Sequence, residues 1–342
     1  MTELKLEKCK IAVDAMGGDY APKHEILGAI AAMKENKNFD LILVGDKEKI
    51  LKVARQEKIE LDENVIYHAS QVIEMGDKPI DSIKSKPDSS LVVGAKLVRD
   101  KKAHAFVSAG NTGAVAAVST LIIGRIKNVE RPTIGSFIPS ETNDTYLFDV
   151  GAFVDVKPQH LLEYAILASI FVKELHGIKS PSVALLNVGE EEEKGNKQVK
   201  ETAELLRKSD LNFIGNIEGR DILKGKSNIV ICDGFVGNII LKFGESVPSF
   251  MKYLLKQHAE KNIFEKIKIG LFKNTLKKAL SPLNPDLYGG VPLLGVNGIS
   301  IIGHGSSSPL AIKNMILRAK EMYDKNLIKK FEEALKTYAI KK

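Results

Sequence analysis

The chain has 342 residues, of which 44% are hydrophobic and 27% charged, a composition typical of a folded globular protein with one large core or two smaller ones. Its 50 Lys and Arg against 43 Asp and Glu give a net charge of +7, which raises the question of a nucleic-acid or membrane partner. The two cysteines, Cys9 and Cys232, exclude a disulfide scaffold and a zinc module, and they suit a reducing cytoplasm.

Short apolar runs of strand length alternate with longer stretches of helical periodicity. In chain order, the predicted strands cover residues 10–14, 40–44, 65–68, 105–108, 146–149, 182–187, 213–217, 229–232 and 300–303. The predicted helices cover residues 24–35, 90–100, 113–124, 159–176, 194–208 and 310–325. This alternation predicts an α/β fold, with a parallel sheet and helices on its faces.

The length favours two packed lobes over one. We place the first lobe at residues 1–143 plus 300–342 and the second at residues 144–299, and we expect the C-terminal helix to return to the first lobe. Two long uncharged stretches, 103–124 and 287–312, contain glycine and polar residues that a lipid-exposed helix avoids. We therefore expect no transmembrane span.

The loops after the predicted strands are rich in glycine, asparagine, serine and aspartate. They cover residues 14–19, 108–113, 149–152, 187–195, 215–219, 233–238 and 303–306. Glycine lets backbone N–H groups approach an anion, and a helix that starts behind such a loop adds the positive end of its dipole. A single loop of this kind is more often a turn or a helix cap, but their repetition at strand ends favours a site for phosphate or a similar anion.

Well-known catalytic motifs are scarce. The sequence has no GxGxxG opening a helix, no P-loop, no GxSxG and no HExxH, and Cys232 ends an apolar run typical of a buried strand. His304 stands between two glycines, and both a structural and a functional role stay open for it. The four glutamates 190–193 are expected in the solvated first turn of a helix, although one of them and Lys194 could instead face a substrate.

Residues 249–281 carry apolar positions at helical spacing and predict two helices joined near residues 262–270. Eight Lys and two Glu lie within 248–282, with the lysines between the apolar positions. We expect the stems of this hairpin to pack in a dimer, whereas Ile269, Leu271 and Phe272 at its tip have the composition of a bilayer-interface segment. Because the positive charge gathers here and at the C-terminus, and the chain has no Trp, nucleic acid is not an expected partner.

Six motifs extend from the first predicted strand to the last. They read DAMGGDYAP at 14–22, VSAGNTGA at 107–114, LLNVGEEEEKGN at 185–196, GNIEG at 215–219, DGFVGN at 233–238 followed by Lys242, and HG at 304–305. In this order they closely resemble the bacterial phosphate acyltransferase family, the acyl-carrier-protein:phosphate enzymes of phospholipid synthesis. The first two motifs are highly specific.

The resemblance implies a two-lobed fold similar to isocitrate and isopropylmalate dehydrogenases and to phosphotransacetylase, with a helical projection linked to homodimer formation and peripheral membrane contact. It implies transfer of a long fatty acyl group from acyl carrier protein to inorganic phosphate. The acyl phosphate formed would feed a membrane-bound glycerol-3-phosphate acyltransferase. Neither a cofactor nor a metal is expected, and the implied location is the cytoplasm at the inner face of the cell membrane.

The motif positions also supply candidate site residues. Lys194, His304 and Asn238 are the candidate catalytic residues, with Lys194 and Lys242 offsetting phosphate charge and His304 transferring a proton or contacting an oxyanion. The candidates for binding phosphate or the acyl thioester are Asp14, Gly17, Gly18, Asp19, Ser108, Gly110, Asn111, Thr112, Gly113, Asn187, Gly189, Glu191, Gly195, Asn216, Glu218, Asp233, Gly234, Lys242 and Gly305.

One position departs from the family pattern. Phe153 stands where the family usually has Asn, so we do not expect position 153 to contact a substrate. Two alternatives stay open: a metal- and NAD-dependent decarboxylating dehydrogenase of the same fold, and a catalytically silent membrane-associated scaffold. The dehydrogenase would need an arginine-rich pocket, yet the seven arginines are scattered along the chain.

Overall fold

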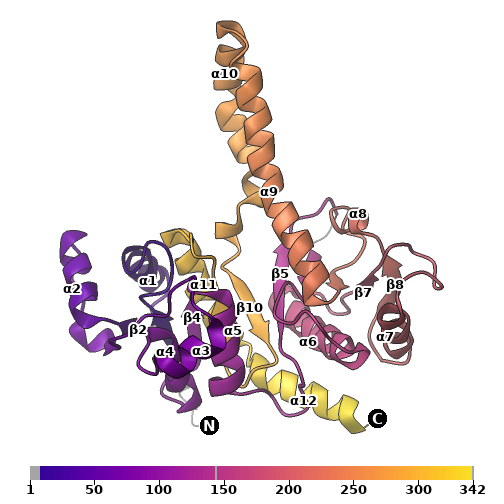
Figure 1. The fold of residues 1–342 in the computed structure, drawn as a ribbon, viewed down its shortest axis with the longest axis horizontal. Coiled ribbons are helices and arrows are strands. Elements are labelled where there is room, and N and C mark those ends of the chain that lie inside the picture. The colour runs from indigo at the N-terminus through magenta and orange to yellow at the C-terminus, as the bar shows by residue number, and fades with distance from the viewer. Residues whose placement is uncertain (1–7, 143–144, 341–342) are drawn as a thin grey trace, which may run out of the picture.

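The computed structural model describes residues 8–142 and 145–340, and its strands form one eleven-stranded sheet. The order across the sheet is β3-β2-β1-β4-β11-β10-β5-β6-β9-β7-β8 (Figure 1). The strands are β1 (Cys9–Asp14), β2 (Phe39–Gly45), β3 (Ile66–His68), β4 (Ala105–Ser108), β5 (Thr133–Ile138), β6 (Thr145–Phe148), β7 (Val183–Leu186), β8 (Phe213–Ile217), β9 (Ile229–Ile231), β10 (Val291–Leu294) and β11 (Ile299–Ile302). The predicted α/β class is confirmed.

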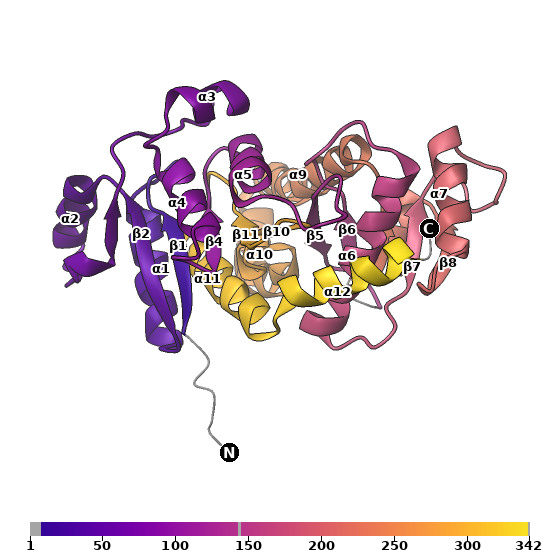
Figure 2. The same cartoon turned by 90° about the horizontal axis from the view of Figure 1, so that it is seen from below.

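Helices cover both faces of the sheet. They are α1 (Lys23–Glu35), α2 (Lys47–Gln56), α3 (Pro79–Ser85), α4 (Ser90–Arg99), α5 (Thr112–Val118), α6 (Pro158–His176), α7 (Lys197–Arg207), α8 (Gly219–Ile222), α9 (Gly234–Ala259), α10 (Ile263–Ala279), α11 (Pro309–Asp324) and α12 (Leu327–Ile340). Figure 2 shows α4, α5 and the base of α9 on one face, with α1, α11 and α12 on the other.

The strands are buried on both sides, and alternate residues supply two separate core layers. Ile11 and Val13 of β1 belong to the layer beneath α1 and α11, whereas Ala12 between them belongs to the layer beneath α4. The strand β9 repeats this pattern. Burial on both faces explains why these strands appear in the sequence as nearly continuous apolar runs.

The strand direction reverses in the middle of the sheet. β1, β2, β3, β4 and β11 run parallel to one another, and β6, β7, β8 and β9 form a second parallel group. Between the groups, β10 is antiparallel to β11 and β5, and β5 is antiparallel to β6. The two groups therefore run in opposite directions within one sheet.

The two central strands are the ones that the sequence prediction omits. Pro292 lies inside β10, and Pro132 and Pro139 flank β5, so the local signals argue against strands at both places. Pairing with neighbours overrides those signals, since Leu293 pairs with Ile134 and joins the two halves of the sheet. The prediction also omits α2, α3 and α12.

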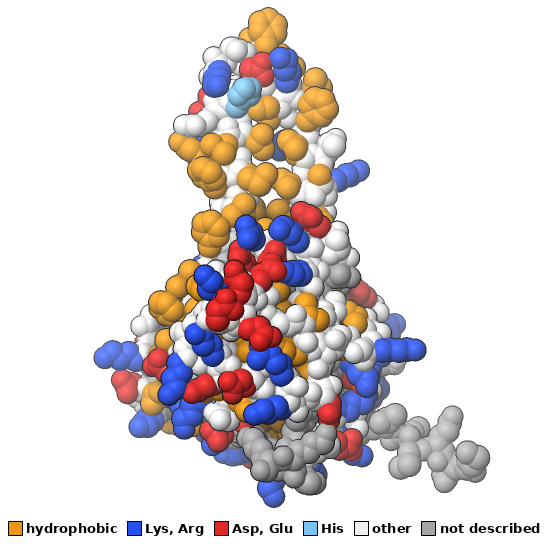
Figure 3. Space-filling model, turned by 90° about the vertical axis from the view of Figure 1, so that its right-hand side faces the viewer, with side chains coloured by type: hydrophobic (Ala, Val, Ile, Leu, Met, Phe, Trp, Pro, Cys, Tyr) orange, Lys and Arg blue, Asp and Glu red, His pale blue; other side chains and the backbone are white. Residues whose placement is uncertain are grey.

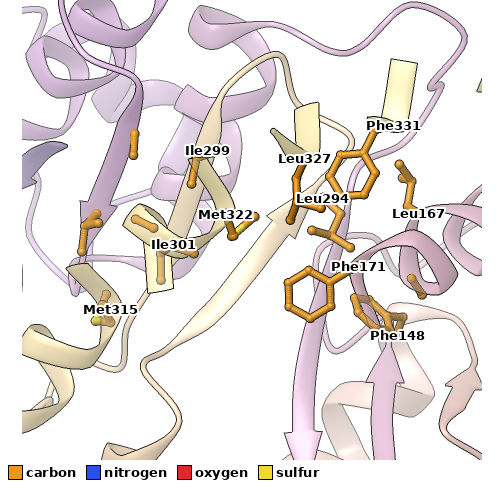
Figure 4. Close-up of a cluster of buried hydrophobic side chains, with 14 of the residues drawn as sticks. Phe148, Leu167, Phe171, Leu294, Ile299, Ile301, Met315, Met322, Leu327 and Phe331 are labelled. Atoms are coloured by element: carbon orange, nitrogen blue, oxygen red, sulfur yellow. The ribbon is translucent and has the colours of Figure 1, made fainter. Parts of the chain in front are cut away.

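The C-terminal helices bridge the two halves. α11 packs against α1, whereas α12 crosses the sheet to α6, whose residues we place in the second lobe. Figure 4 shows Leu327 and Phe331 of α12 beside Leu294 and Leu167, within a continuous row of apolar side chains. Leu327 and Phe331 are fully buried, so burial of the apolar side of α12 accounts for this crossing.

The predicted helical hairpin is present as α9 and α10, which project from the body of the molecule (Figure 1). Its bounds differ from the prediction. α9 begins at Gly234 rather than at 249 and continues through Pro248, and the chain turns at residues 260–262. As a result, Ile269, Leu271 and Phe272 lie within α10 rather than in the connection.

Exposed apolar side chains are concentrated on the hairpin. Figure 3 shows apolar side chains along its length, above a body covered mainly by charged residues. Phe243 is 72% exposed near the base, Phe264 is 72% exposed near the tip, and Leu271 is 76% exposed in the middle of α10. Exposed apolar surface on this scale marks an interaction surface. Among the described residues, no helix is long and apolar enough to span a membrane.

Candidate active site

A buried carboxyl group joins the loops after β1 and β4. Asp14, the last residue of β1, is 1% exposed, and its Oδ2 accepts a hydrogen bond from Ser108 Oγ at 2.7 Å. Ser108 Oγ in turn accepts from the Gly110 N–H at 3.0 Å. Burial raises the pKa of Asp14, and hydrogen bonds from serine side chains oppose that rise. Asp14 and Ser108 thus act as the framework of two glycine loops.

The loop at residues 16–19 is closely packed around backbone atoms. A Cβ on Gly17 would lie 2.3 Å from Asp14 Oδ2, and Gly18 has a φ of +118° that favours glycine. The Asp19 N–H donates to Gly305 O at 2.7 Å and so attaches the loop that follows β11. We call the loops at residues 14–19, 108–113 and 303–306 the first loop set.

Glu25 lies directly behind the first loop set, in the first turn of α1. It is 2% exposed, and its Oε1 lies 2.9 Å from the place where a Cβ on Gly18 would be. Its Oε2 is buried with no hydrogen-bond partner among the described residues. Burial, reinforced by the negative charge of Asp14, raises the pKa of Glu25 to about 8. The carboxyl group is therefore mainly protonated at pH 7.

A second buried carboxyl group organises the loops after β6 and β9. Burial raises the pKa of Asp149 to about 6, and hydrogen bonds from backbone N–H groups oppose that rise. A Cβ on Gly234 would lie 3.0 Å from Asp149 Oδ2, so α9 begins directly against this carboxyl group. The N–H groups that donate to Asp149, at 3.0–3.2 Å, are those of Ile134, Gly151, Ala152 and Phe153.

The backbone of Phe153 takes part in the hydrogen bonding around Asp149. Its N–H donates to Asp149, and its ring lies beneath the Arg131 guanidinium, 4.8 Å from the ring centroid to Cζ. The side chain is therefore engaged in a cation–π contact. The hydrogen bonds of the loop to Asp149 come from backbone N–H groups and do not use the side chain at position 153.

Asparagine side chains hold the loop at residues 187–196. Asn187 Nδ2 donates to Lys194 O at 3.2 Å, and Asn216 Nδ2 donates to Glu191 O at 3.3 Å. Asn216 Oδ1 is buried without a hydrogen-bond partner in the described part of the chain. We call the loops at residues 149–153, 187–196, 216–219 and 233–238 the second loop set.

The four glutamates do not form a helix turn, which corrects the sequence expectation. Asn196 caps α7, whose first residue is Lys197, so residues 190–193 lie in the preceding loop. Glu190 Oε1 lies 2.7 Å from Lys226 Nζ, and Glu192 Oε1 lies 3.1 Å from Arg207 Nη2. These two carboxylates are paired with cations at the surface instead of with a helix dipole.

The structure divides the predicted site residues between the two sets. The first set contains Asp14, Gly17, Gly18, Asp19, Ser108, Gly110, Asn111, Thr112, Gly113, His304 and Gly305. The second set contains Asn187, Gly189, Glu191, Lys194, Gly195, Asn216, Glu218, Asp233, Gly234 and Asn238, with Lys242 one turn farther along α9.

Several of the predicted site residues cap helices or form ion pairs within the loops. Asn111 Oδ1 accepts from the Ala114 N–H as the cap of α5, and its Nδ2 donates to the Met75 and Asp77 carbonyl oxygens. Asp233 caps α9. Glu218 precedes α8 and lies 2.7 Å from Arg220 Nε. For these residues, ordinary capping accounts for the motif.

Three of the predicted site residues, Lys194, Lys242 and His304, have exposed polar groups that can contact a substrate. Lys194 and Lys242 are exposed, and neither Nζ forms an ion pair within the described residues. His304 is also exposed, and its Nδ1 accepts from the Ser306 N–H at 3.2 Å. With Nδ1 accepting, the neutral imidazole of His304 carries its proton on Nε2 as a donor.

The two loop sets follow strands of opposite direction, so they leave the sheet toward opposite edges. α5 begins at the first set and α9 at the second. Both ribbon views place these helices on the same face of the sheet, on either side of β10 (Figures 1 and 2). The predicted residues therefore form two clusters beside one shared face.

Sequence reasoning missed Glu25 and left Asp149 out of the candidate site. The signal for Glu25 is an acidic residue on the apolar side of α1, beside Ile26 and Ala29, but charged residues near a helix start are common. In the described residues, no group of three or more His, Cys, Asp and Glu side chains is arranged to hold a metal ion.

Comparison with known proteins identifies the family. The profile of a family described as "Fatty acid synthesis protein" matches residues 9–330. The phosphate acyltransferase of Chlorobaculum parvum is 45% identical over 327 residues, covering 93% of this chain and 96% of that protein. The chain belongs to the phosphate acyltransferase family. As a phosphate acyltransferase family member it is an acyltransferase enzyme, which decides against the dehydrogenase and scaffold alternatives.

Solved structures support the fold of this phosphate acyltransferase family member. A phosphotransacetylase from Streptococcus pyogenes has a TM-score of 0.62 at 17% identity, covering 93% of this chain and 95% of that chain. A 4-hydroxythreonine-4-phosphate dehydrogenase from Klebsiella pneumoniae has a TM-score of 0.51 at 10% identity, covering 92% and 99%. The expected likeness to phosphotransacetylase is confirmed, and the same fold also serves a dehydrogenase.

Proposed function

We propose that this enzyme transfers a long-chain fatty acyl group from acyl carrier protein to inorganic phosphate, giving acyl phosphate for phospholipid synthesis. The observation that carries the proposal is the full-length family match, with the specific glycine motifs placed in two loop sets beside one face of the sheet. The relatives are named for acyl transfer to phosphate, and an acyl thioester, such as that of acyl carrier protein, is an activated form suited to this transfer.

The reaction needs positioning and charge stabilisation more than a strong nucleophile. A phosphate oxygen attacks the thioester carbon, the carbonyl oxygen becomes an oxyanion, and the C–S bond then breaks. The carrier leaves as a thiolate. Because the corresponding thiol has a pKa near 8.5, the thiolate is a competent leaving group. Acyl phosphate and free carrier are the products. Backbone N–H groups of glycine loops are suited to hold both the phosphate and the oxyanion.

Three side chains have the chemistry to act directly. We assign Lys194 and Lys242, whose ammonium groups are unpaired among the described residues, to offset phosphate charge. We assign His304 Nε2 as a hydrogen-bond donor to the oxyanion or the phosphate. The positioning of these groups falls to Asn187, which holds the Lys194 carbonyl, and to Asp149 and Asp14 behind the loops.

The test is phosphate-dependent release of the free carrier thiol from acyl carrier protein loaded with chains of different length. We expect Lys194→Ala and His304→Ala to lower kcat/KM by about 100-fold each, the usual effect of losing one charge-stabilising donor. Lys197→Ala is the matched control, since its ammonium group is exposed on α7 beside Glu201. Wild-type-like activity in both test variants contradicts the assignment, and absence of phosphate-dependent release from the wild type contradicts the function.

We also propose that the enzyme works as a homodimer at the inner face of the cell membrane, through the α9–α10 hairpin. Support comes from the exposed apolar side chains along both helices and from the lysines between them. Acyl phosphate made at the membrane surface would pass directly to a membrane-bound glycerol-3-phosphate acyltransferase. The acidic acyl carrier protein is the expected soluble partner of this basic chain.

A further inference from the structure

A cavity of about 300 Å³ lies outside both loop sets, at the junction of β5, β6 and β10. It extends to the C-terminal end of α6, to α11, and to the segment that returns from the hairpin. Six residues define its character: Phe137, Tyr146, Phe171, His176, Tyr288 and Arg318. We call it the aromatic pocket. Its volume is at the lower end of the range of small-molecule sites, about 300–1,000 Å³.

The walls of the aromatic pocket are formed by rings packed against one another. The Phe137 and Tyr288 centroids lie 4.1 Å apart, Phe137 and Tyr146 lie 5.4 Å apart in an edge arrangement, and Tyr146 and Phe171 lie 6.1 Å apart. The two longer separations are typical of favourable aromatic contacts, and Phe137 and Tyr288 lie closer still. The wall of the pocket is therefore built largely from aromatic rings.

Among the described lining residues, Arg318 is the one charged side chain of the pocket, and it forms an ion pair with Glu321 beside the pocket. Tyr146 Oη lies 2.8 Å from His176 Nε2, and burial together with the charge of Arg318 lowers the pKa of His176 to about 4. At neutral pH the imidazole is uncharged, so Arg318 is the cation of the pocket. Its Nη1 donates to Glu321 Oε2 at 3.1 Å, which leaves other N–H groups for a ligand. None of the described lining residues is acidic.

The pocket is also connected to the apolar hairpin. Tyr288 Oη donates to Pro282 O at 2.5 Å, which ties one pocket wall to the chain directly after α10. Leu283 and Leu287, between the hairpin and the pocket, are 38% and 45% exposed. Exposed apolar side chains thus continue along the chain from α10 to Tyr288 in the pocket wall.

We propose that the aromatic pocket binds an aliphatic chain with an anionic head group, either a carboxylate or a phosphate. The chain would lie against the rings, and the head group would accept hydrogen bonds from Arg318. The Arg318 N–H groups that Glu321 does not use favour an anionic head group, because a guanidinium donates its strongest hydrogen bonds to carboxylate and phosphate oxygens. The choice of an aliphatic chain rests on the proposed function; the preference for an apolar anion rests on the pocket itself.

The experiment uses the absence of tryptophan from the chain. Tyr288→Trp places a single tryptophan, which can be excited selectively, in the pocket wall of the full-length protein. Decanoate, decyl phosphate and decanol are titrated below their aggregation limits. We expect saturable changes in emission with both anions and weaker binding of decanol. Calorimetric titration of the wild type with decanoate checks that the tryptophan has not created the site.

Arg318→Gln in the Tyr288→Trp background tests the head-group contact. We expect at least about tenfold weaker binding of both anions, the usual loss for a charged hydrogen bond, with decanol unaffected. Arg55→Gln, an exposed arginine far along the chain, is the matched control. Absence of saturable anion binding, or equal losses for decanol and decanoate, overturns the proposal. Because the readout is binding, it is independent of whether phosphate-dependent thiol release is observed.

Discussion

At the scale of single residues, Asp149 and Glu25, two of the three buried carboxyl groups described behind the loop sets, differ in how their hydrogen-bonding capacity is satisfied. Asp149 accepts four backbone hydrogen bonds, which compensate much of its burial. Glu25 has a buried oxygen without a hydrogen-bond partner among the described residues, and the negative charge of Asp14 further raises the pKa of Glu25. The charge state of Glu25 therefore affects the stability of the protein near neutral pH.

Glu25→Gln tests this difference. The ordinary pKa of the glutamate is 4.5, whereas in the folded protein it is about 8. Between these values the folded state binds one proton more than the unfolded state, so wild-type stability falls as the pH rises from about 5 to 8. Glutamine removes this dependence. We expect the stability of the variant relative to the wild type to rise by about 2–4 kcal/mol over that interval.

Urea denaturation at each pH supplies the measurement. Glu60→Gln is the matched control, because Glu60 is exposed in a loop, and its stability should stay parallel to the wild type across the same range. A Glu25→Gln difference that stays constant between pH 5 and pH 8 would show that Glu25 is already ionised in the folded protein.

The glycine motifs are easier to predict from the sequence than the buried residues that support the loops. The glycine loops were predictable because tight turns and close backbone approach restrict the residue type, as at Gly17 and Gly18. Glu25 was not predictable, because a single acidic residue in a helix normally faces water. The position of Phe153 depends on Arg131, which is distant in sequence from it, and no local pattern contains such a contact.

At the scale of elements, periodicity predicted the strands and helices that bury regular apolar faces. It also predicted the hairpin, although α9 starts on the sheet and passes Pro248 before it leaves the body. β5 and β10 were missed because their stability comes from pairing in the centre of the sheet. The reversal of strand direction, which separates the two loop sets, depends on those two strands and was missed with them.

The hairpin carries the next prediction. Leu271 is 76% exposed on α10, near Lys268 and Lys273. Leu271→Glu should weaken binding to vesicles of anionic phospholipid by about tenfold or more, because it replaces apolar contact with a charge that the surface repels. Acyl transfer in solution should persist. Cosedimentation with the vesicles is the measurement.

Leu223→Glu is the control for this variant, since Leu223 is 59% exposed on the body next to α8. Its vesicle binding should equal that of the wild type. Light scattering on both variants separates loss of membrane contact from loss of a dimer. Unchanged cosedimentation of Leu271→Glu would rule out this part of the hairpin as the membrane contact.

At the scale of the whole molecule, one apolar core extends across both halves. In Figure 4 it passes from Met315 and Ile301 through Leu327 and Leu294 to Phe171. The two lobes that we propose from the sequence therefore share a sheet and a core. We expect a single cooperative unfolding transition in which the halves do not melt separately.

Leu327→Ala tests that coupling. Leu327 is fully buried where α12 meets the centre of the molecule, so its truncation should cost about 2–5 kcal/mol in the free energy of unfolding. Leu223→Ala, at an exposed leucine, should cost less than about 1 kcal/mol. Calorimetry should show one transition shifted downward in Leu327→Ala. Two resolved transitions in the wild type would mean that the halves are independent.

The position of β11 has a consequence for how the chain is made. β11 is formed by residues near the C-terminus, yet it pairs with β4 in the interior of the sheet. During synthesis, the backbone groups of β4 that pair with β11 stay unpaired until Ile299 has left the ribosome. At about 5–20 residues per second, the chain between β4 and Ile299 takes on the order of ten seconds or more to synthesise. An unpaired edge of this kind recruits other strands. In the nascent chain, the pairing between β4 and β11 in the interior of the sheet therefore cannot form until most of the chain has been synthesised.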